Sequence, residues 1–216
     1  MNKKIKNALK RLNDILPLYE KQQQSGEQIK LLHQHILRSF VTQGRILSRE
    51  EMAEYVDNLD EAINILSNND MVTFSETGTP MGAYPFTMEV LEHKVQVNGF
   101  TVHAMCALDA LAVSSMFNIK TQITSLCRVT AEPINIEQSG EAIENISQTT
   151  NIHFGIIWAA ADASSSCADS LCMDMIFLKD KNTAQQWLMD SPENREIFTL
   201  TEAVEFSSRF FTPLIS

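Results

Sequence analysis

Cys106 and Asp109 stand three residues apart in a run of the sequence that favours a helix. Side chains at positions i and i+3 are neighbours on a helix surface, so this thiol and this carboxyl group should lie one turn apart on one face. The pairing suits thiolate chemistry with a proton donor close by. A second thiol, that of Cys172, follows far downstream. These three residues are the candidate catalytic residues.

The sequence also predicts how the chain reaches Cys106. Two valines, Val95 and Val97, precede an Asn98-Gly99 turn, and alternating residues follow it, which is typical of a β-hairpin. An apolar helix is then expected over residues 107–116, closed by two serines. Cys106 would lie at the N-terminus of that helix, where the partial positive charge lowers the pKa of a thiol below its free value of about 8.5.

The chain has four cysteines, at positions 106, 127, 167 and 172. No Cys-x-x-Cys pair is present and the five histidines show no zinc-ligand spacing with the cysteines, which argues against a preformed structural zinc site. In a reducing compartment we expect free thiols and no disulfide framework. We interpret Cys127 as a small buried hydrophobe, and Cys167 as a loop cysteine in preference to a third ligand.

Downstream of the helix, the sequence predicts an α+β arrangement. Strands are expected at residues 122–128, 134–137 and 153–160, and the run 171–178, which carries Cys172, is typical of a buried strand or helix. The last part adds a helix around residues 184–189, a short strand at 197–198 and a helix at 202–211. The fold class is therefore α+β, with a mixed or antiparallel β-sheet domain flanked by helices.

The N-terminal part is predicted to be helical. Residues 2–24 form an amphipathic helix that Pro17 kinks, and residues 28–40 form a second helix. Ser48 and Glu51 make a capping box that opens a third. A further helix at 62–66 and a hairpin at 71–84 complete the order helix, turn, helix and wing. We therefore expect three domains: an amphipathic helix at 1–27, a winged-helix-like subdomain at 28–85 and a catalytic domain at 86–216.

A winged helix raises the question of DNA binding, and charge argues against it. The helix that would enter a groove has Asp60 and Glu61 but no Lys or Arg. The whole chain has 17 Lys and Arg against 27 Asp and Glu, a net charge of -10. A surface for phosphates needs clustered basic residues. We expect no nucleic-acid partner and interpret the subdomain as a scaffold or a lid.

A membrane partner is not expected either. The basic start of the chain is not followed by the apolar region of a signal peptide. No apolar run approaches the roughly 20 residues that a membrane span requires. The sequence therefore predicts a cytoplasmic protein.

The order of these features resembles the organomercurial (alkylmercury) lyase family. The matching residues are those at 104–111, 125–127, 171–172 and 176–178, and weaker agreement extends over most of residues 30–210. The resemblance implies an enzyme that cleaves a carbon–mercury bond by protonolysis and gives a hydrocarbon and Hg(II). It implies no organic cofactor, because mercury is both substrate and product, and small external thiols or a downstream mercury-handling protein would take the product.

By position, the resemblance makes Cys106 and Cys172 the mercury-binding thiols, Asp109 the proton donor and Cys127 a structural cysteine. The same three active residues would face the mercury of substrate and product. Mercury is a soft ion that prefers thiolates, and two thiolates push charge onto the leaving carbon. A carboxyl group beside that carbon can deliver the proton, and an apolar pocket would keep Asp109 protonated near neutral pH.

The chain departs from the family at three positions. The family usually has an aromatic residue before each catalytic cysteine and a histidine soon after the second, whereas Met105, Leu171 and Asp174 stand here. Two other functions therefore stay open. One is a non-catalytic soft-metal (Hg or Cu) binding protein or metal-responsive winged-helix regulator. The other is a winged-helix interaction domain whose cysteines only pack.

Overall fold

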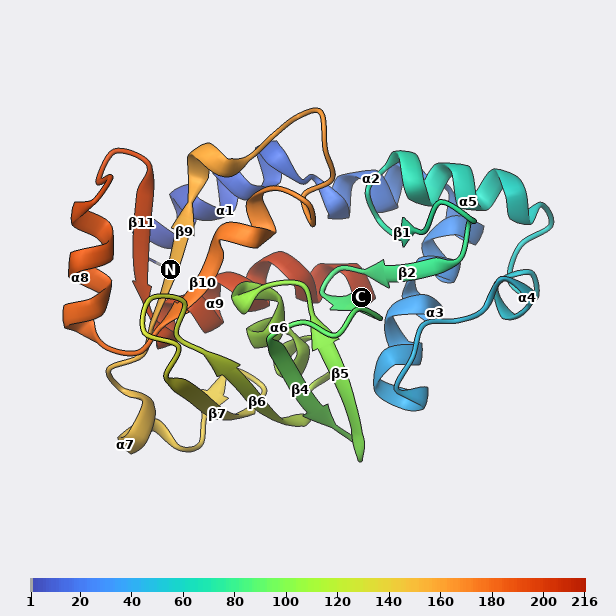
Figure 1. Ribbon diagram of the computed structural model, residues 1–216. Helices are drawn as coiled ribbons and strands as arrows, with labels where there is room; N and C mark the ends of the chain where they lie inside the picture. Colours follow the sequence, from blue (N-terminus) through green and yellow to red (C-terminus); the bar gives the residue numbers. More distant parts are fainter. Residues whose placement is uncertain (1) are drawn as a thin grey trace.

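Two antiparallel sheets lie on either side of a central pair of helices in the computed structural model, which describes residues 2–216 (Figure 1). The larger sheet has the strand order β1-β2-β3-β5-β4-β6-β7-β8 and the smaller has the order β10-β9-β11. The strands are β1 Thr73–Phe74, β2 Pro80–Ala83, β3 Phe86–Thr87, β4 His93–Val97, β5 Phe100–Ala104, β6 Lys120–Leu126, β7 Pro133–Ser139, β8 Ala142–Ile143, β9 His153–Ile157, β10 Met175–Leu178 and β11 Arg195–Thr199. The α+β class expected from the sequence is confirmed.

The helices cover the sheets and fill the space between them. Helix α6 packs on the larger sheet and on α9, and α9 packs in turn on the smaller sheet. The α-helices are α1 Lys3–Ile15, α2 Leu18–Gln24, α3 Glu27–Gln43, α4 Arg49–Met52, α5 Leu59–Asn68, α6 Ala107–Phe117, α7 Ile146–Thr149, α8 Lys181–Met189 and α9 Leu200–Phe211. The 3-10 helices are η1 Trp158–Ala160, η2 Leu171–Asp174 and η3 Thr212–Ile215. Within residues 2–216, no helix is long and apolar enough to cross a membrane.

The N-terminal helices follow the local signals of the sequence. Pro17 separates α1 from α2, and Gly44 ends α3 in the left-handed conformation, with a φ of 72°. Ser48 and Glu51 form the expected capping box at the start of α4. The apolar face of α1 is buried and packs on α9, and its polar face stays exposed.

Helices α3, α4 and α5 are followed by the hairpin of β1 and β2, in the order that suggested a winged helix. Strand β2 also pairs with β3, where Gly82 lies opposite Thr87. The hairpin therefore forms one end of the eight-stranded sheet. The hydrogen bonds between β2 and β3 cross the boundary that we expected after residue 85. The winged-helix subdomain and the division into three domains stay predictions.

Helix α6 is buried on nearly all sides because it lies between the larger sheet and α9. The hairpin of β4 and β5 leads into it through the Asn98-Gly99 turn, as expected, and Cys106 is its N-cap. The helix does not end at Ser114 and Ser115. It continues to Phe117, because both serine hydroxyls donate to backbone carbonyls nearby and Asn118 makes the left-handed cap.

The downstream strands agree with the sequence except at their ends. Strand β6 buries alternate residues, and it ends at Leu126, so Cys127 lies just beyond it in a turn closed by the hydrogen bond from its N–H to the carbonyl of Glu132. The run 171–178 contains a turn of 3-10 helix, η2, followed directly by a buried strand, β10. Cys172 therefore lies in the helical turn that precedes the strand.

Candidate active site

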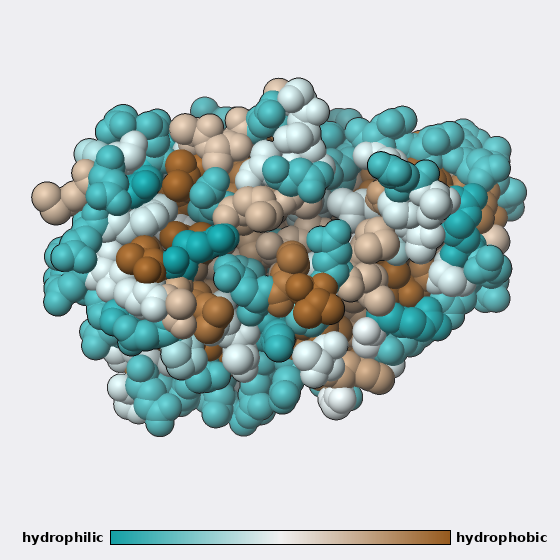
Figure 2. Space-filling view, viewed as in Figure 1, coloured by the Kyte–Doolittle hydropathy of each residue, from teal (hydrophilic) through white to brown (hydrophobic). Residues whose placement is uncertain are grey.

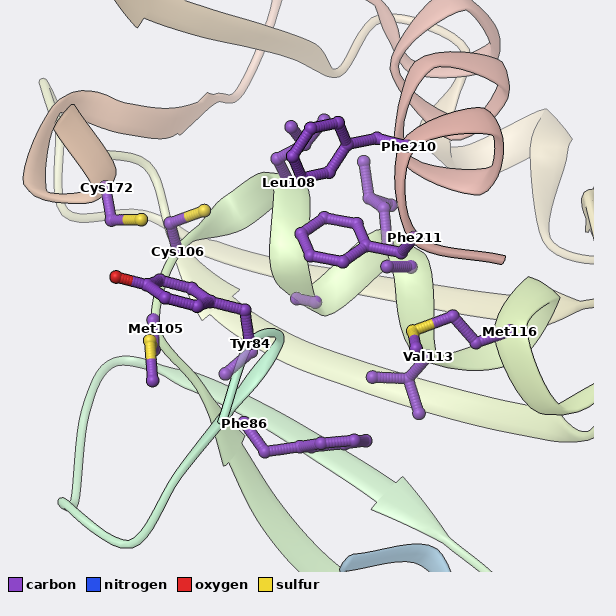
Figure 3. Close-up of a cluster of buried hydrophobic side chains, with 14 of the residues drawn as sticks. Tyr84, Phe86, Met105, Cys106, Leu108, Val113, Met116, Cys172, Phe210 and Phe211 are labelled. Atoms are coloured by element: carbon purple, nitrogen blue, oxygen red, sulfur yellow. The ribbon is translucent and has the colours of Figure 1, made fainter. Parts of the chain in front are cut away.

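Three residues from two distant parts of the chain meet at the N-terminus of α6. Cys106 ends the connection from β5, Asp109 lies in the first turn of α6, and Cys172 lies in η2. One ligand atom from each, a sulfur or a carboxylate oxygen, lies within 4.8 Å of the other two, and all three residues are buried. Figure 3 shows Cys106 and Cys172 side by side on their two segments. The structure thus brings together all three residues that the sequence singled out.

Long-range packing holds the second segment against the first. Strand β10 pairs with β9 in the smaller sheet and also packs on α6. Met175, the first residue of β10, has its sulfur 3.6 Å from that of Cys106, and the Cys106 thiol donates to it. Met175 was not identified from the sequence, although its position three residues after Cys172, directly after the helical turn η2, gives a signal for it.

The sulfur of Cys106 caps helix α6. It accepts the backbone N–H of Asp109 at 3.4 Å, which favours the thiolate. Burial nevertheless raises the pKa of Cys106 to about 12, and the negative charge of Asp109 adds to the increase. The expectation of a lowered thiol pKa is therefore wrong, because Cys106 is completely shielded from water and the loss of hydration outweighs the helix terminus.

Burial also keeps the carboxyl group of Asp109 protonated. The residue is 2% exposed, and burial raises its pKa to about 8, although hydrogen bonds with the side chain and backbone of Cys106 oppose the increase. Its Oδ2 atom is buried and has no hydrogen-bond partner among the described residues. A buried oxygen without a hydrogen-bond partner lowers the stability of the fold, unless another group occupies the site and satisfies it. Asp109 is thus an acid that holds its proton near neutral pH, as the sequence led us to expect.

Hydrogen bonds with Cys106 and Cys167 raise the pKa of the Cys172 thiol, and burial raises it further. Asp174 is half-buried and is not among these principal causes. Cys167, which we interpreted as a loop cysteine, is in contact with the site, since its sulfur lies 3.6 Å from that of Cys172. The sequence analysis missed this contact because a spacing of five residues is typical of neither a helix face nor a strand face.

Apolar and aromatic side chains surround the three residues. Met105 and Leu171, which stand where the resembling family has aromatic residues, are both buried. The ring of Tyr84 lies beside Cys106, with its hydroxyl end on the Cys172 side (Figure 3). That hydroxyl donates to Asp70 at 3.1 Å and accepts the N–H of Ala168 at 2.7 Å. Nothing in the local sequence pattern pointed to Tyr84.

Cys127 is not one of the three clustered residues. Burial raises the pKa of its thiol, but hydrogen bonds from the hydroxyl of Thr130 and from backbone N–H groups in its turn outweigh that effect, and the pKa is lowered overall. The residue closes its own turn, since the N–H of Ala131 donates to its carbonyl.

The trio combines two sulfur atoms with one oxygen in a space from which water is largely excluded. Two thiols, with the thioether of Met175 beside them, make a soft donor set, which selects soft metals over magnesium or calcium. The protonated carboxyl group adds an acid within reach of anything the sulfurs hold. The arrangement can therefore bind a soft cation and protonate a group attached to it.

Comparisons with known proteins point to one family. A family model described as alkylmercury lyase matches residues 86–212. An alkylmercury lyase of Bacillus cereus is 25% identical over 183 residues, which cover 84% of this chain and 81% of that protein. One of Streptomyces lividans is 23% identical over 157 residues, covering 72% and 71%. The crystal structure of the mercury-bound form of MerB2 shares the fold, with a TM-score of 0.75 at 18% identity over 94% of this chain and 98% of that one.

Proposed function

This chain belongs to the alkylmercury lyase family, and we propose that Cys106, Asp109 and Cys172 are the residues with which it works. It is an organomercurial lyase: it cleaves a carbon–mercury bond by protonolysis and gives a hydrocarbon and Hg(II). The observation that carries the assignment of residues is the meeting of two thiols and one protonated carboxyl group within 4.8 Å.

Mercury enters the site by replacing thiol protons. The organomercurial arrives with a small thiolate attached, its mercury bonds to the sulfur of Cys106, and the proton of Cys106 leaves with the displaced small thiol. This exchange creates no net charge, which matters because burial disfavours a bare thiolate at Cys106. The raised thiol pKa therefore does not prevent binding, since metal takes the place of the proton.

Protonolysis then uses the other two residues. As the thiol sulfur of Cys172 approaches mercury, it and the thiolate sulfur of Cys106 donate into the metal, and negative charge develops on the carbon. Asp109 gives its proton to that carbon, the carbon–mercury bond breaks, and the hydrocarbon leaves. The proton of Cys172 passes to the Asp109 carboxylate, so the acid is restored while Hg(II) stays on the two sulfurs. The unpartnered Oδ2 of Asp109 supports this role.

This chemistry needs no organic cofactor, because every group that moves belongs to the substrate, to the three residues or to a thiol. Hg(II) on two thiolates is a stable product, so small external thiols, or a downstream mercury-handling protein, remove it. We keep residues 1–27 and 28–85 as an amphipathic helix and a winged-helix-like scaffold, and residues 86–216 as the catalytic domain. Neither nucleic acid nor a membrane has a part in the mechanism.

The function is tested by incubating purified protein with phenylmercury and excess cysteine and measuring benzene by gas chromatography. Benzene should accumulate over many turnovers. The variants Cys106→Ser, Cys172→Ser and Asp109→Ala should each lose nearly all of it. If the unmutated protein releases no benzene, the assignment of lyase activity is wrong.

Asp109 also separates the lyase from a non-catalytic soft-metal binder or metal-responsive regulator. A binder needs its two thiols and not the acid. Full benzene release by Asp109→Ala would show that the carboxyl group is not the proton donor. Retention of Hg(II) binding in that variant, together with loss of benzene, is the result expected of the lyase.

A further inference from the structure

Cys167 is a third buried thiol beside the proposed centre, and it borders a cavity. The cavity has a volume of about 600 Å³ and lies between the end of α1, the middle of α2, the end of α5 and the loop over residues 161–170. Cys167 contributes to its wall, together with Lys21, Asp70 and serines of the loop, whereas Cys106 and Cys172 do not. A molecule in the cavity therefore meets Cys167 before it meets either thiol of the trio.

The loop that carries Cys167 offers a polar, uncrowded approach. It contains the run Ser164, Ser165 and Ser166 and small residues around it, and it lies at the top centre of Figure 1. Figure 2 shows this segment mainly in white and tan, the colours of weakly polar and small apolar residues. Small side chains leave room for a small polar thiol, and the wall is net acidic, since Lys21 lies among Asp14, Asp70 and Asp162.

The backbone holds the two sulfurs of this segment in contact. The carbonyl of Cys167 accepts the N–H of Cys172 at 2.9 Å, which turns the chain so that the two sulfurs lie 3.6 Å apart. The N–H of Cys167 donates to Asp70 at 2.9 Å, and the next N–H, that of Ala168, donates to Tyr84. Hydrogen bonds at both the N–H and the carbonyl of Cys167 thus hold the residue against Cys172.

The geometry points to Cys167 as an exit thiol, which takes Hg(II) from Cys106 and Cys172 and presents it to a small thiol in the cavity. This inference rests on the proposed function, because it concerns the product of that reaction. Without a third sulfur, Hg(II) would have to leave a buried site while short of a ligand, and a bare cation in such a place is very unfavourable. With Cys167 in contact with Cys172, each new mercury–sulfur bond forms as an old one breaks.

The transfer balances without any change in oxidation state. The sulfur of Cys167 bonds to Hg(II), the bond between mercury and Cys106 breaks, and the proton of Cys167 passes to the sulfur of Cys106. Hg(II) is then held by Cys167 and Cys172. Two small thiols in the cavity next replace these sulfurs in turn, each giving its proton to the cysteine that it displaces. The protein returns to its starting state with all three thiols protonated.

The first test measures release separately from cleavage. Unmutated protein and Cys167→Ser are each loaded with one equivalent of HgCl₂, mixed with excess cysteine, and separated by rapid gel filtration for measurement of bound mercury by atomic absorption. We expect release from Cys167→Ser to be at least tenfold slower. The matched control is Cys127→Ser, the same substitution at a buried thiol outside the cluster, and it should release mercury at the unmutated rate.

The second test asks whether Cys167 can hold mercury with Cys172. Cys106→Ser should bind one Hg(II) that withstands competition by equimolar cysteine, because two sulfurs remain. Cys106→Ser/Cys167→Ser should lose that resistance by at least tenfold, whereas Cys106→Ser/Cys127→Ser should keep it. Circular dichroism spectra check that each variant is folded, and Cys167→Ala in place of serine repeats the comparison if the first variant does not fold.

The outcomes separate this inference from the proposed function. Equal release rates for Cys167→Ser and the unmutated protein, or equal binding by the two double variants, would overturn the exit thiol and leave the lyase intact. Failure of the unmutated protein to release benzene from phenylmercury would overturn the lyase, whatever the loading experiments give. With excess phenylmercury, Cys167→Ser should give a burst of one equivalent of benzene and then turn over at its slow release rate.

Discussion

Two regions of this protein bury a cysteine, and they treat its sulfur in opposite ways. At the end of β6, hydroxyl and N–H donors surround the sulfur of Cys127 and lower its pKa. At the N-terminus of α6, a second thiol, a carboxyl group and a thioether surround Cys106, and burial raises its pKa to about 12. The more acidic thiol is therefore outside the cluster. What distinguishes the candidate active site is the convergence of soft donors from separate segments, because mercury itself replaces the thiol proton.

The largest expected effect comes from making the same substitution in both regions. Cys106→Ser should reduce the turnover number for benzene release by a factor on the order of 10³ or more, because a hydroxyl oxygen is a poor ligand for a soft metal. Cys127→Ser should change it by less than about threefold, since serine can accept the same hydrogen bonds. Comparable losses in two folded variants would remove the distinction between the regions.

The pH dependence of turnover should follow Asp109. Its pKa is about 8, so the carboxyl group holds the proton needed for protonolysis below that pH and loses it above. We expect the turnover number to fall about tenfold per pH unit above pH 8 and to be nearly constant between pH 6 and 7. The lowered pKa of Cys127 should leave no mark on this profile. A rate that continued to rise through pH 9 would contradict the role of Asp109 as the acid.

The pH dependence of the protein's stability should come from Asp109 and not from groups near the end of β6. An unfolded aspartate has an ordinary pKa of 3.8, so between pH 4 and pH 8 the unfolded chain releases a proton that the folded protein keeps, and stability falls as pH rises. Asp109→Asn removes this dependence. We expect it to be inactive but to melt at a higher temperature, by on the order of 10 °C at pH 8, with a smaller gain at pH 5.

The control for that measurement is Glu132→Gln beside Cys127. Glu132 forms an exposed ion pair with Lys179, and such pairs contribute little to stability. Its melting temperature should stay within about 2 °C of the unmutated value at both pH values. Parallel pH profiles for unmutated protein and Asp109→Asn would show that the carboxyl group is not protonated in the folded state.

The smallest expected effect tests the hydrogen bonds that hold Cys167. Tyr84→Phe removes the hydroxyl that joins Asp70 to the backbone of Ala168. It should lower the free energy of unfolding by about 1 kcal/mol and slow mercury release several-fold, because Cys167 is then less firmly held against Cys172. Tyr19→Phe, at an exposed tyrosine, is the control for the loss of a hydroxyl. Chemical denaturation and the loading assay give the two readings, and a normal release rate would exclude Tyr84 as a positioning residue.

Local signals in the sequence predicted those parts of the fold that depend on neighbouring residues. The Asn98-Gly99 hairpin, the Ser48 capping box and the helix that begins after Cys106 are examples. The sequence did not predict that β5 lies between β3 and β4, because that order depends on contacts between distant strands. The meeting of Cys106 with Cys172 likewise came from a family resemblance and not from spacing.

One expectation about the site was wrong because burial outweighs a local signal. The helix N-terminus was expected to lower the pKa of Cys106, and it does favour the thiolate, but its effect is smaller than that of burial, which the local sequence does not reveal. Cys167 does lie in a loop, as interpreted, but no helical or extended pattern in the sequence reveals its contact with Cys172. A turn closed by one backbone hydrogen bond makes that contact.

The position of Cys172 on a separate segment has a consequence for synthesis of the protein. Cys106 leaves the ribosome 66 residues ahead of Cys172, an interval of roughly 3–13 s at usual rates of elongation. During that time Cys106 lacks the strand and the second thiol that later enclose it, and α9, which covers α6, is not yet made. A growing chain therefore displays a mercury-reactive sulfur before it can detoxify anything.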